Sequence, residues 1–424
     1  MKKIIASAGM VAVGATGLHA ANYGDSSPDE AGKRWSVSAA VRGFYDDNYT
    51  TRPSRRDPVT GERLKRDSFG FEVSPSAALN LPMETSFLGL TYTYTLSYYE
   101  ARDANKTDQS HDVALTFDHR FSERYHVNLH NQFVYSIEPT LVEQGQTITT
   151  PLRADAEVLH NRAVLGFDAQ ITPLWSVLVG YANNYYNYND DRYSALLDRV
   201  EHLFRVEPRH HLAPNTLVFG GYQYGITDYL SEDFITDTTD FLEPDVRGTD
   251  RDNESHYAYV GTEHKFSSVL TVEGRVGVQF ITYSELDQDD FSPYADIVGT
   301  YSYMPGSYVK LGVKQAHNAT DVSGPSLNEL TLDQDATTVF LSVRHRLTAL
   351  LSGELFGQYQ HSTYNGGIAD GESDDYVSMG LRLAYKINRH FSAETGYSLD
   401  HLSSYDDARG FTRNRVFVGV RGTY

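Results

Sequence analysis

The sequence has 424 residues, a formal net charge of −20, 31 tyrosines and no cysteine. The lack of cysteine excludes disulfides, thiolate metal sites and a cysteine nucleophile. The acidic balance argues against a nucleic-acid partner, because phosphate binding requires clustered lysine and arginine.

Residues 1–20 have the pattern of a signal peptide. Lys2 and Lys3 form a positive segment, residues 4–18 are mostly apolar, and Ala20 ends a tolerable cleavage site. A membrane anchor is the alternative, but the apolar run is short for a spanning helix. We therefore expect a signal peptide at 1–20, a short periplasmic segment at 21–34 and a barrel at 35–424.

From residue 35 onward, apolar and polar residues alternate with a period of two. The segment 35–45 places its large apolar side chains on one face and Arg42 on the other, and 87–99, 269–283 and 376–387 repeat the pattern. This period predicts strands, because helices repeat every 3.6 residues. Strands of about a dozen residues match the length that a tilted crossing of a bilayer requires.

The predicted connections alternate between short and long. The short ones lie at 81–85, 121–125, 171–175, 211–215, 265–268, 303–307, 346–350 and 387–391, and the long ones at 48–67, 101–109, 138–156, 190–194, 228–254, 284–290, 320–335, 365–374 and 406–411. One hairpin per roughly forty residues also suits a β-propeller, but propeller blades carry four short strands each. The pattern instead predicts an all-β, transmembrane, antiparallel up-and-down β-barrel of about 18 strands, with short periplasmic turns and long acidic extracellular loops.

The predicted strands begin near 35, 68, 86, 111, 125, 157, 175, 196, 216, 255, 269, 292, 307, 336, 350, 375, 391 and 412. The last one alternates valines with arginines and ends on Tyr424. It must pair with the first strand to close the sheet, and it resembles the terminal signal that the barrel assembly machinery of the outer membrane recognises.

Taken together, the Tyr-rich strands, the turns that begin Phe-Ser and the final aromatic strand resemble the family of outer-membrane β-barrel porins of Gram-negative bacteria. The resemblance implies a location in the outer membrane, in contact with lipid and lipopolysaccharide. It also implies a channel, either for passive diffusion of small polar or anionic solutes or, as for some members, for export of an exopolysaccharide. An outer-membrane enzyme or adhesin on the same scaffold is the alternative, and a secreted soluble β-protein is disfavoured by the many apolar faces.

Ten basic residues occupy predicted inward positions and are candidates for lining a pore: Arg42, Lys310, Lys314, Arg344, Arg346, Arg382, Lys386, Arg413, Arg415 and Arg421. Glu354, Glu394 and Asp400 oppose those of the carboxy-terminal half. Two interpretations are open: a basic wall that favours anions, or charge ladders that fill the interior.

Other chemistry finds little support in the sequence. The acidic segments 227–254, 284–290 and 370–375 are either a solvated rim or carboxylates that bridge to lipopolysaccharide through divalent cations. The 16 histidines show no spacing typical of a metal site. No G-x-S-x-G motif occurs. We therefore expect no enzyme activity, no cofactor and no metal.

Overall fold

The computed structural model describes residues 33–137, 157–231, 234–236, 246–322 and 330–424. The predicted signal peptide at 1–20, nearly all of the 21–34 segment, and much of the predicted loops 138–156, 228–254 and 320–335 lie outside the described residues. Within these ranges no helix is long and apolar enough to cross a membrane.

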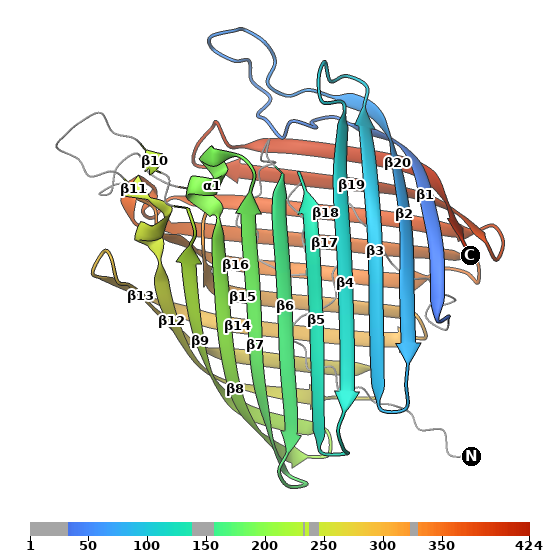
Figure 1. Ribbon diagram of the computed structural model, residues 1–424, viewed down its shortest axis with the longest axis vertical. Coiled ribbons are helices and arrows are strands. Elements are labelled where there is room, and N and C mark those ends of the chain that lie inside the picture. The colour runs from blue at the N-terminus through green and yellow to red at the C-terminus, as the bar shows by residue number, and fades with distance from the viewer. Residues whose placement is uncertain (1–32, 138–156, 232–233, 237–245, 323–329) are drawn as a thin grey trace.

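Eighteen strands form one antiparallel sheet that closes on itself (Figure 1). Their bounds are β1 Trp35–Asp46, β2 Ser68–Pro82, β3 Ser86–Tyr99, β4 Thr107–Arg120, β5 Tyr125–Ser136, β6 Val158–Gln170, β7 Trp175–Tyr188, β8 Arg199–Ala213, β9 Thr216–Tyr229, β12 Asn253–Lys265, β13 Leu270–Tyr283, β14 Gln288–Met304, β15 Ser307–Asn318, β16 Asp333–Arg346, β17 Leu351–Asn365, β18 Ser373–Lys386, β19 Phe391–Ser404 and β20 Phe411–Thr423. Each strand pairs with its neighbours along the chain, and β20 pairs with β1. The predicted closed barrel of about 18 strands is confirmed.

The seam between the first and last strands is held by an unbroken register from Ser38 opposite Thr423 to Asp46 opposite Arg415. Beyond it, Val37 and Tyr424 exchange two backbone hydrogen bonds of 3.2 and 2.9 Å. The final strand therefore closes the sheet, as its alternation predicts.

A few boundaries differ from the sequence prediction. β4 begins at Thr107 and β14 at Gln288, each four residues earlier than expected, so the loops after β3 and β13 are shorter. These strand ends are polar, and a pattern based on apolar alternation misses them even though Asp289 and Asp290 pair with β13. The start of β8 is later than expected, because α1 (Asp191–Leu197) precedes it.

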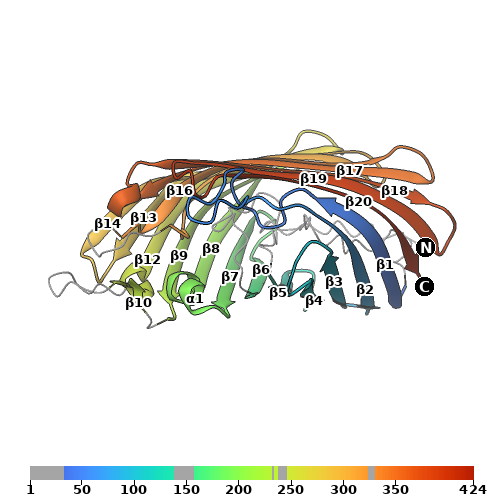
Figure 2. The same ribbon diagram turned by 90° about the horizontal axis from the view of Figure 1, so that it is seen from above.

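The connections place two unlike ends on the barrel. All connections of four residues or fewer, except the one after β13, lie at one end, which we call the short-turn end, and the others lie at the opposite, long-loop end (Figure 1). The long-loop end carries α1, the hairpin β10 (Phe234–Thr236) and β11 (Val246–Arg247), and the short helices η1 (Gly248–Arg251) and η3 (Gly367–Ala369). Seen from this end the barrel is flattened, with β3–β8 on one broad face and β15–β19 on the other (Figure 2).

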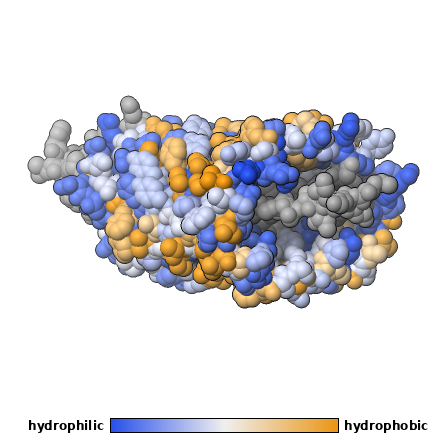
Figure 3. Space-filling model, turned by 90° about the horizontal axis from the view of Figure 1, so that it is seen from below, coloured by the Kyte–Doolittle hydropathy of each residue, from blue (hydrophilic) through white to orange (hydrophobic). Residues whose placement is uncertain are grey.

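The outer surface of the barrel is apolar. Along β1, Trp35, Val37 and Val41 are exposed, whereas Ser36 and Arg42 are buried on the inner face. In the view from below, hydrophobic patches alternate with hydrophilic ones over the surface (Figure 3). Exposed aromatic residues near this end are Trp35, Phe121, Tyr125, Trp175, Phe266, Phe391 and Tyr424, an arrangement typical of the aromatic girdle at a membrane interface.

Small apolar clusters lie at the long-loop end. One of them joins Val246, Ile281 and Tyr283 to Leu330 and Leu332, which immediately precede β16. Part of the connection between β15 and β16 therefore packs against the inner side of β13 at the mouth of the barrel.

Candidate functional site: the charged inner wall

The inner wall carries a continuous chain of ion pairs with Glu394 at its centre. The Glu394 carboxylate on β19 accepts from Arg42 of β1 at 2.9 Å, Arg382 of β18 at 2.8 Å and Arg421 of β20 at 2.7 Å. The Glu394 side chain is 1% exposed. Alternation puts these four residues on inward positions, and the closure of β20 onto β1 brings Arg42 within reach of Glu394.

The chain of ion pairs continues in both directions from Glu394. Toward β2, Arg42 contacts Glu72 at 2.5 Å, and Glu72 contacts Arg415 at 3.1 Å. Toward β16, Glu354 forms ion pairs with Arg382 at 3.6 Å and with Arg344 at 3.4 Å. We call these eight residues the arginine ladder: Arg42, Glu72, Arg344, Glu354, Arg382, Glu394, Arg415 and Arg421.

Within the ladder, five guanidinium groups face three carboxylates, a net charge of +2. A further inward pair, Arg413 and Asp46 at 2.5 Å, is neutral. Because buried carboxylates and guanidinium groups lose their hydration, each is stable there only when it is paired.

Aromatic rings support two of the arginines. The Arg42 guanidinium lies 5.2 Å from the centre of the Phe417 ring, and that of Arg415 lies 4.2 Å from the Phe44 ring. Such cation–π contacts fix the direction of the side chains and cover these faces of the rings.

A second charged cluster lies on β8, β12 and β13, far around the barrel from the ladder. Glu207, fully buried, accepts from Arg209 at 2.6 Å and from the Tyr259 hydroxyl at 2.9 Å, and lies 3.5 Å from Arg275. Arg275 also contacts Glu273 at 2.6 Å. Here the charges are closely balanced, so the two walls differ in net charge.

The structure brings six of the ten predicted pore-lining residues together: Arg42, Arg344, Arg382, Arg413, Arg415 and Arg421 lie in the ladder or next to it. Lys310 lies above the Phe340 ring at 5.8 Å, and Lys314 is half-buried on β15. Arg346 and Lys386 end β16 and β18 at the short-turn end. The assignment of all ten to a conducting pore stays a prediction.

Sequence reasoning missed two carboxylates of this wall, Glu72 and Asp46. A signal was present, because Glu72 alternates with the outward Phe69 and Phe71. Their partners were not accessible from spacing, since Arg415 lies at the opposite end of the chain.

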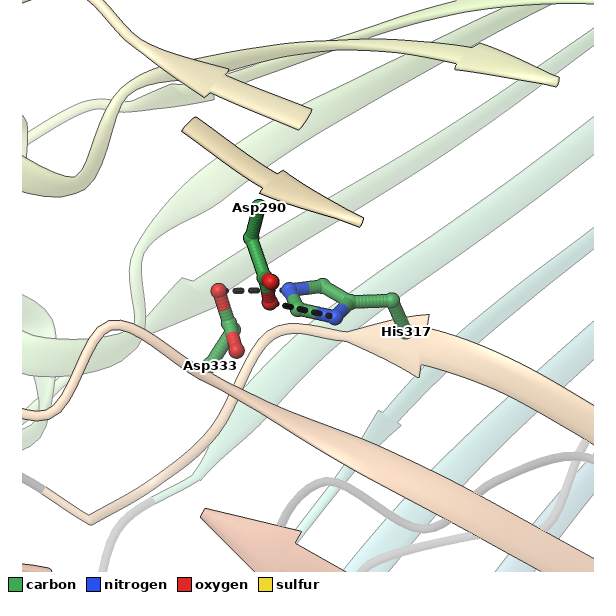
Figure 4. Close-up of side chains that lie close together, drawn as sticks. All are labelled: Asp290, His317 and Asp333. Atoms are coloured by element: carbon green, nitrogen blue, oxygen red, sulfur yellow. Dashed lines mark ion pairs between the residues drawn. The ribbon is translucent and has the colours of Figure 1, made fainter. Parts of the chain in front are cut away.

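One group in the described part of the chain has the side chains to hold a metal ion: Asp290, His317 and Asp333 at the long-loop end (Figure 4). No metal site was predicted from the sequence, because these residues come from three strands and form no motif.

A closed antiparallel barrel with an apolar outside and charged inside defines the class of protein: a porin-like channel of the Gram-negative outer membrane. Residues 36–424 match the family described as "Putative beta-barrel porin 2", and the chain belongs to this family. The resemblance inferred from the sequence is thereby confirmed.

Several solved structures are similar over most of the chain at low identity. OpdK of Pseudomonas aeruginosa, crystallised with vanillate, is 10% identical with a TM-score of 0.42, covering 92% of this chain and 99% of that one. OccK9 (OpdG) of the same organism is 12% identical with a TM-score of 0.44, covering 92% and 98%. A BenF-like porin from Pseudomonas fluorescens Pf-5 is 8% identical with a TM-score of 0.44, covering 92% and 99%. The search of curated proteins found no match.

Proposed function

We propose that the channel passes small anionic solutes by passive diffusion. The observation that carries this proposal is the arginine ladder, in which five guanidinium groups face three carboxylates. Fixed charges on a low-dielectric wall keep their field inside an aqueous path and so bias which ions enter.

Export of an exopolysaccharide is less well supported. A polymer track would need aromatic faces open to sugar rings, whereas guanidinium groups cover Phe44, Phe219 and Phe417 on the inner wall. We further propose that the chain has no enzymatic activity. We also propose that the alternating apolar face of β20 is recognised by the barrel assembly machinery.

The proposal is tested by reversal potentials of the purified protein in planar bilayers under a salt gradient. The wild type should prefer anions. Substituting Arg382, Arg413 and Arg415 together by Ser changes the ladder and the Arg413–Asp46 pair from +2 to −1, so the preference should shift toward cations.

Glu354→Gln serves as the opposite perturbation. It raises the ladder charge to +3 and should increase anion preference. General damage to the pore would move both variants in the same direction, so opposite shifts support the electrostatic proposal. A cation-selective wild type that neither variant alters refutes it, and a barrel without conductance refutes passive diffusion.

A further inference from the structure

Three side chains from three adjacent strands converge at the long-loop end of the barrel. Asp290 lies in β14, His317 near the end of β15, and Asp333 at the start of β16. One ligand atom from each lies within 4.8 Å of the others, and Figure 4 shows the two carboxylates directed at the imidazole. His317 is 6% exposed and Asp333 is 3% exposed.

The two nitrogens of His317 have different surroundings. Nδ1 lies 3.2 Å from Oδ1 of Asp335, which also accepts a hydrogen bond from Ser292 at 2.5 Å, and 3.7 Å from Oδ2 of Asp290. A carboxylate on one ring nitrogen is the usual arrangement of a metal-binding histidine, because it fixes the tautomer that leaves the other nitrogen with its lone pair.

Nε2 of His317 is that other nitrogen. It lies 2.5 Å from Oδ2 of Asp333, yet it has no hydrogen-bond partner of acceptable direction within the described residues. A buried ring nitrogen and a carboxylate oxygen thus lie in direct contact. A ring nitrogen and a carboxylate oxygen that face each other at this distance can both donate electron pairs to a cation bound between them.

A second layer of residues holds the carboxylates in place. The Tyr283 hydroxyl donates to Oδ2 of Asp333. The Asn365 amide donates to Oδ1 of Asp333 at 2.7 Å and to Asp290 at 3.5 Å. Such support keeps ligands oriented. With Asp335 included, three carboxylates surround one buried imidazole, and the negative charge of the buried Asp333 favours a bound cation.

We propose that Asp290, His317 and Asp333 bind a divalent transition-metal ion of the Zn²⁺ class. One imidazole nitrogen and two carboxylate oxygens suit Zn²⁺, with bonds of about 2.0–2.2 Å. Such bonds require Nε2 of His317 and Oδ2 of Asp333 to lie about 3 Å apart, so the two atoms must move only slightly away from each other. Ca²⁺ and Mg²⁺ prefer shells made of oxygen alone, so the imidazole selects against them.

The position of the site gives the ion a structural consequence at the mouth. Asp333 directly follows Leu332, which packs against Ile281 and Tyr283 of β13. A bound ion joins β14, β15 and β16 and fastens the end of the connection between β15 and β16 to the wall. This inference is independent of the solute that the channel passes.

The experiment measures Zn²⁺ binding by calorimetry to the full chain, refolded in detergent after treatment with a chelator. The wild type should bind one high-affinity Zn²⁺ per chain, and Co²⁺ in its place should give the absorption of a nitrogen- and oxygen-ligated ion. His317→Gln and Asp333→Asn should each weaken Zn²⁺ binding at least tenfold. His361→Gln is the matched control, because His361 forms a comparable contact with Asp375 at 2.9 Å on the neighbouring strand β17.

Folding of each variant is checked by its heat-modifiable migration in gels. If the two buried variants fail to fold, the partly exposed Asp290→Asn replaces them, with the same expected loss. Loss of binding in the site variants but not in His361→Gln supports the site. Binding that persists in every site variant places the ion elsewhere, for instance on the acidic loops, and overturns the proposal, as does a wild type that binds no Zn²⁺.

Discussion

Replacing Glu394 by Gln isolates the energetic role of the arginine ladder. Gln preserves the shape of the side chain but removes the charge that three guanidinium groups share at 2.7–2.9 Å. The Glu394 side chain is almost fully buried, so little water is available to replace it. Breaking a buried ion pair by removing one partner costs about 3–5 kcal/mol. Arg42 and Arg382 keep Glu72 and Glu354 as partners, so we expect a loss within this range and not a multiple of it.

The assay is equilibrium unfolding in urea of the barrel refolded into lipid vesicles, with the free energy of unfolding extrapolated to water. Glu263→Gln is the control, since its contact with Lys265 at 3.6 Å is largely exposed and such pairs contribute about 0–1 kcal/mol. A loss of less than about 1 kcal/mol for Glu394→Gln, equal to the control, would show that water screens the inner wall and would refute the reasoning.

Two further predictions concern the outer surface and the loops. Val276→Arg places a charge on the exposed apolar face in the middle of β13, and it should lower the free energy of unfolding in lipid by about 2–4 kcal/mol. The control Val59→Arg, in the loop after β1, should have no effect. Equal stabilities of the two variants would show that the face assignment is wrong. Burial, together with repulsion from Asp228, Glu285 and Asp250, raises the pKa of Asp252 from 3.8 to about 6. The contribution of the protonated Asp252 to loop stability is therefore present at low pH and is lost as pH rises through the range from about 4 to 6. Limited proteolysis of the connection between β9 and β12 should therefore increase over that range and become less pH-dependent in Asp252→Asn. Asp57 has the opposite sign, because hydrogen bonds from the Thr60 and Val59 backbone lower its pKa, and its contribution is lost as pH falls.

Alternation alone predicted most of the barrel, because lipid outside and a charged interior leave each strand little freedom of register. Several strands of the second half, such as β15, β17 and β19, begin within one residue of the expected position. Errors concentrate where this constraint ends. The polar starts of β4 and β14 pair in register with β3 and β13 although they lack an apolar alternation, and α1 is a single short helix inside a loop.

The candidate sites were predictable only in part. Inward positions of arginines such as Arg382 and Arg421 follow from the pattern, but the identity of their shared partner Glu394 depends on closure of the sheet. The group of Asp290, His317 and Asp333 was not predictable, because its residues occupy strand ends whose polar sequence resembles an ordinary loop. Spacing along the chain carries no information about such a convergence.

The pairing of β1 with β20 also has a consequence for how the barrel enters a membrane. Arg42 and Glu394, which meet across the seam region, are 352 positions apart in the sequence. Until β20 arrives, β1 and the growing edge strand both present unpaired backbone N–H and C=O groups along their length. Hydrocarbon has no water to satisfy them, at several kcal/mol for each group. An open sheet of this chain is therefore stable only outside the lipid, so that ring closure and full insertion must be completed together.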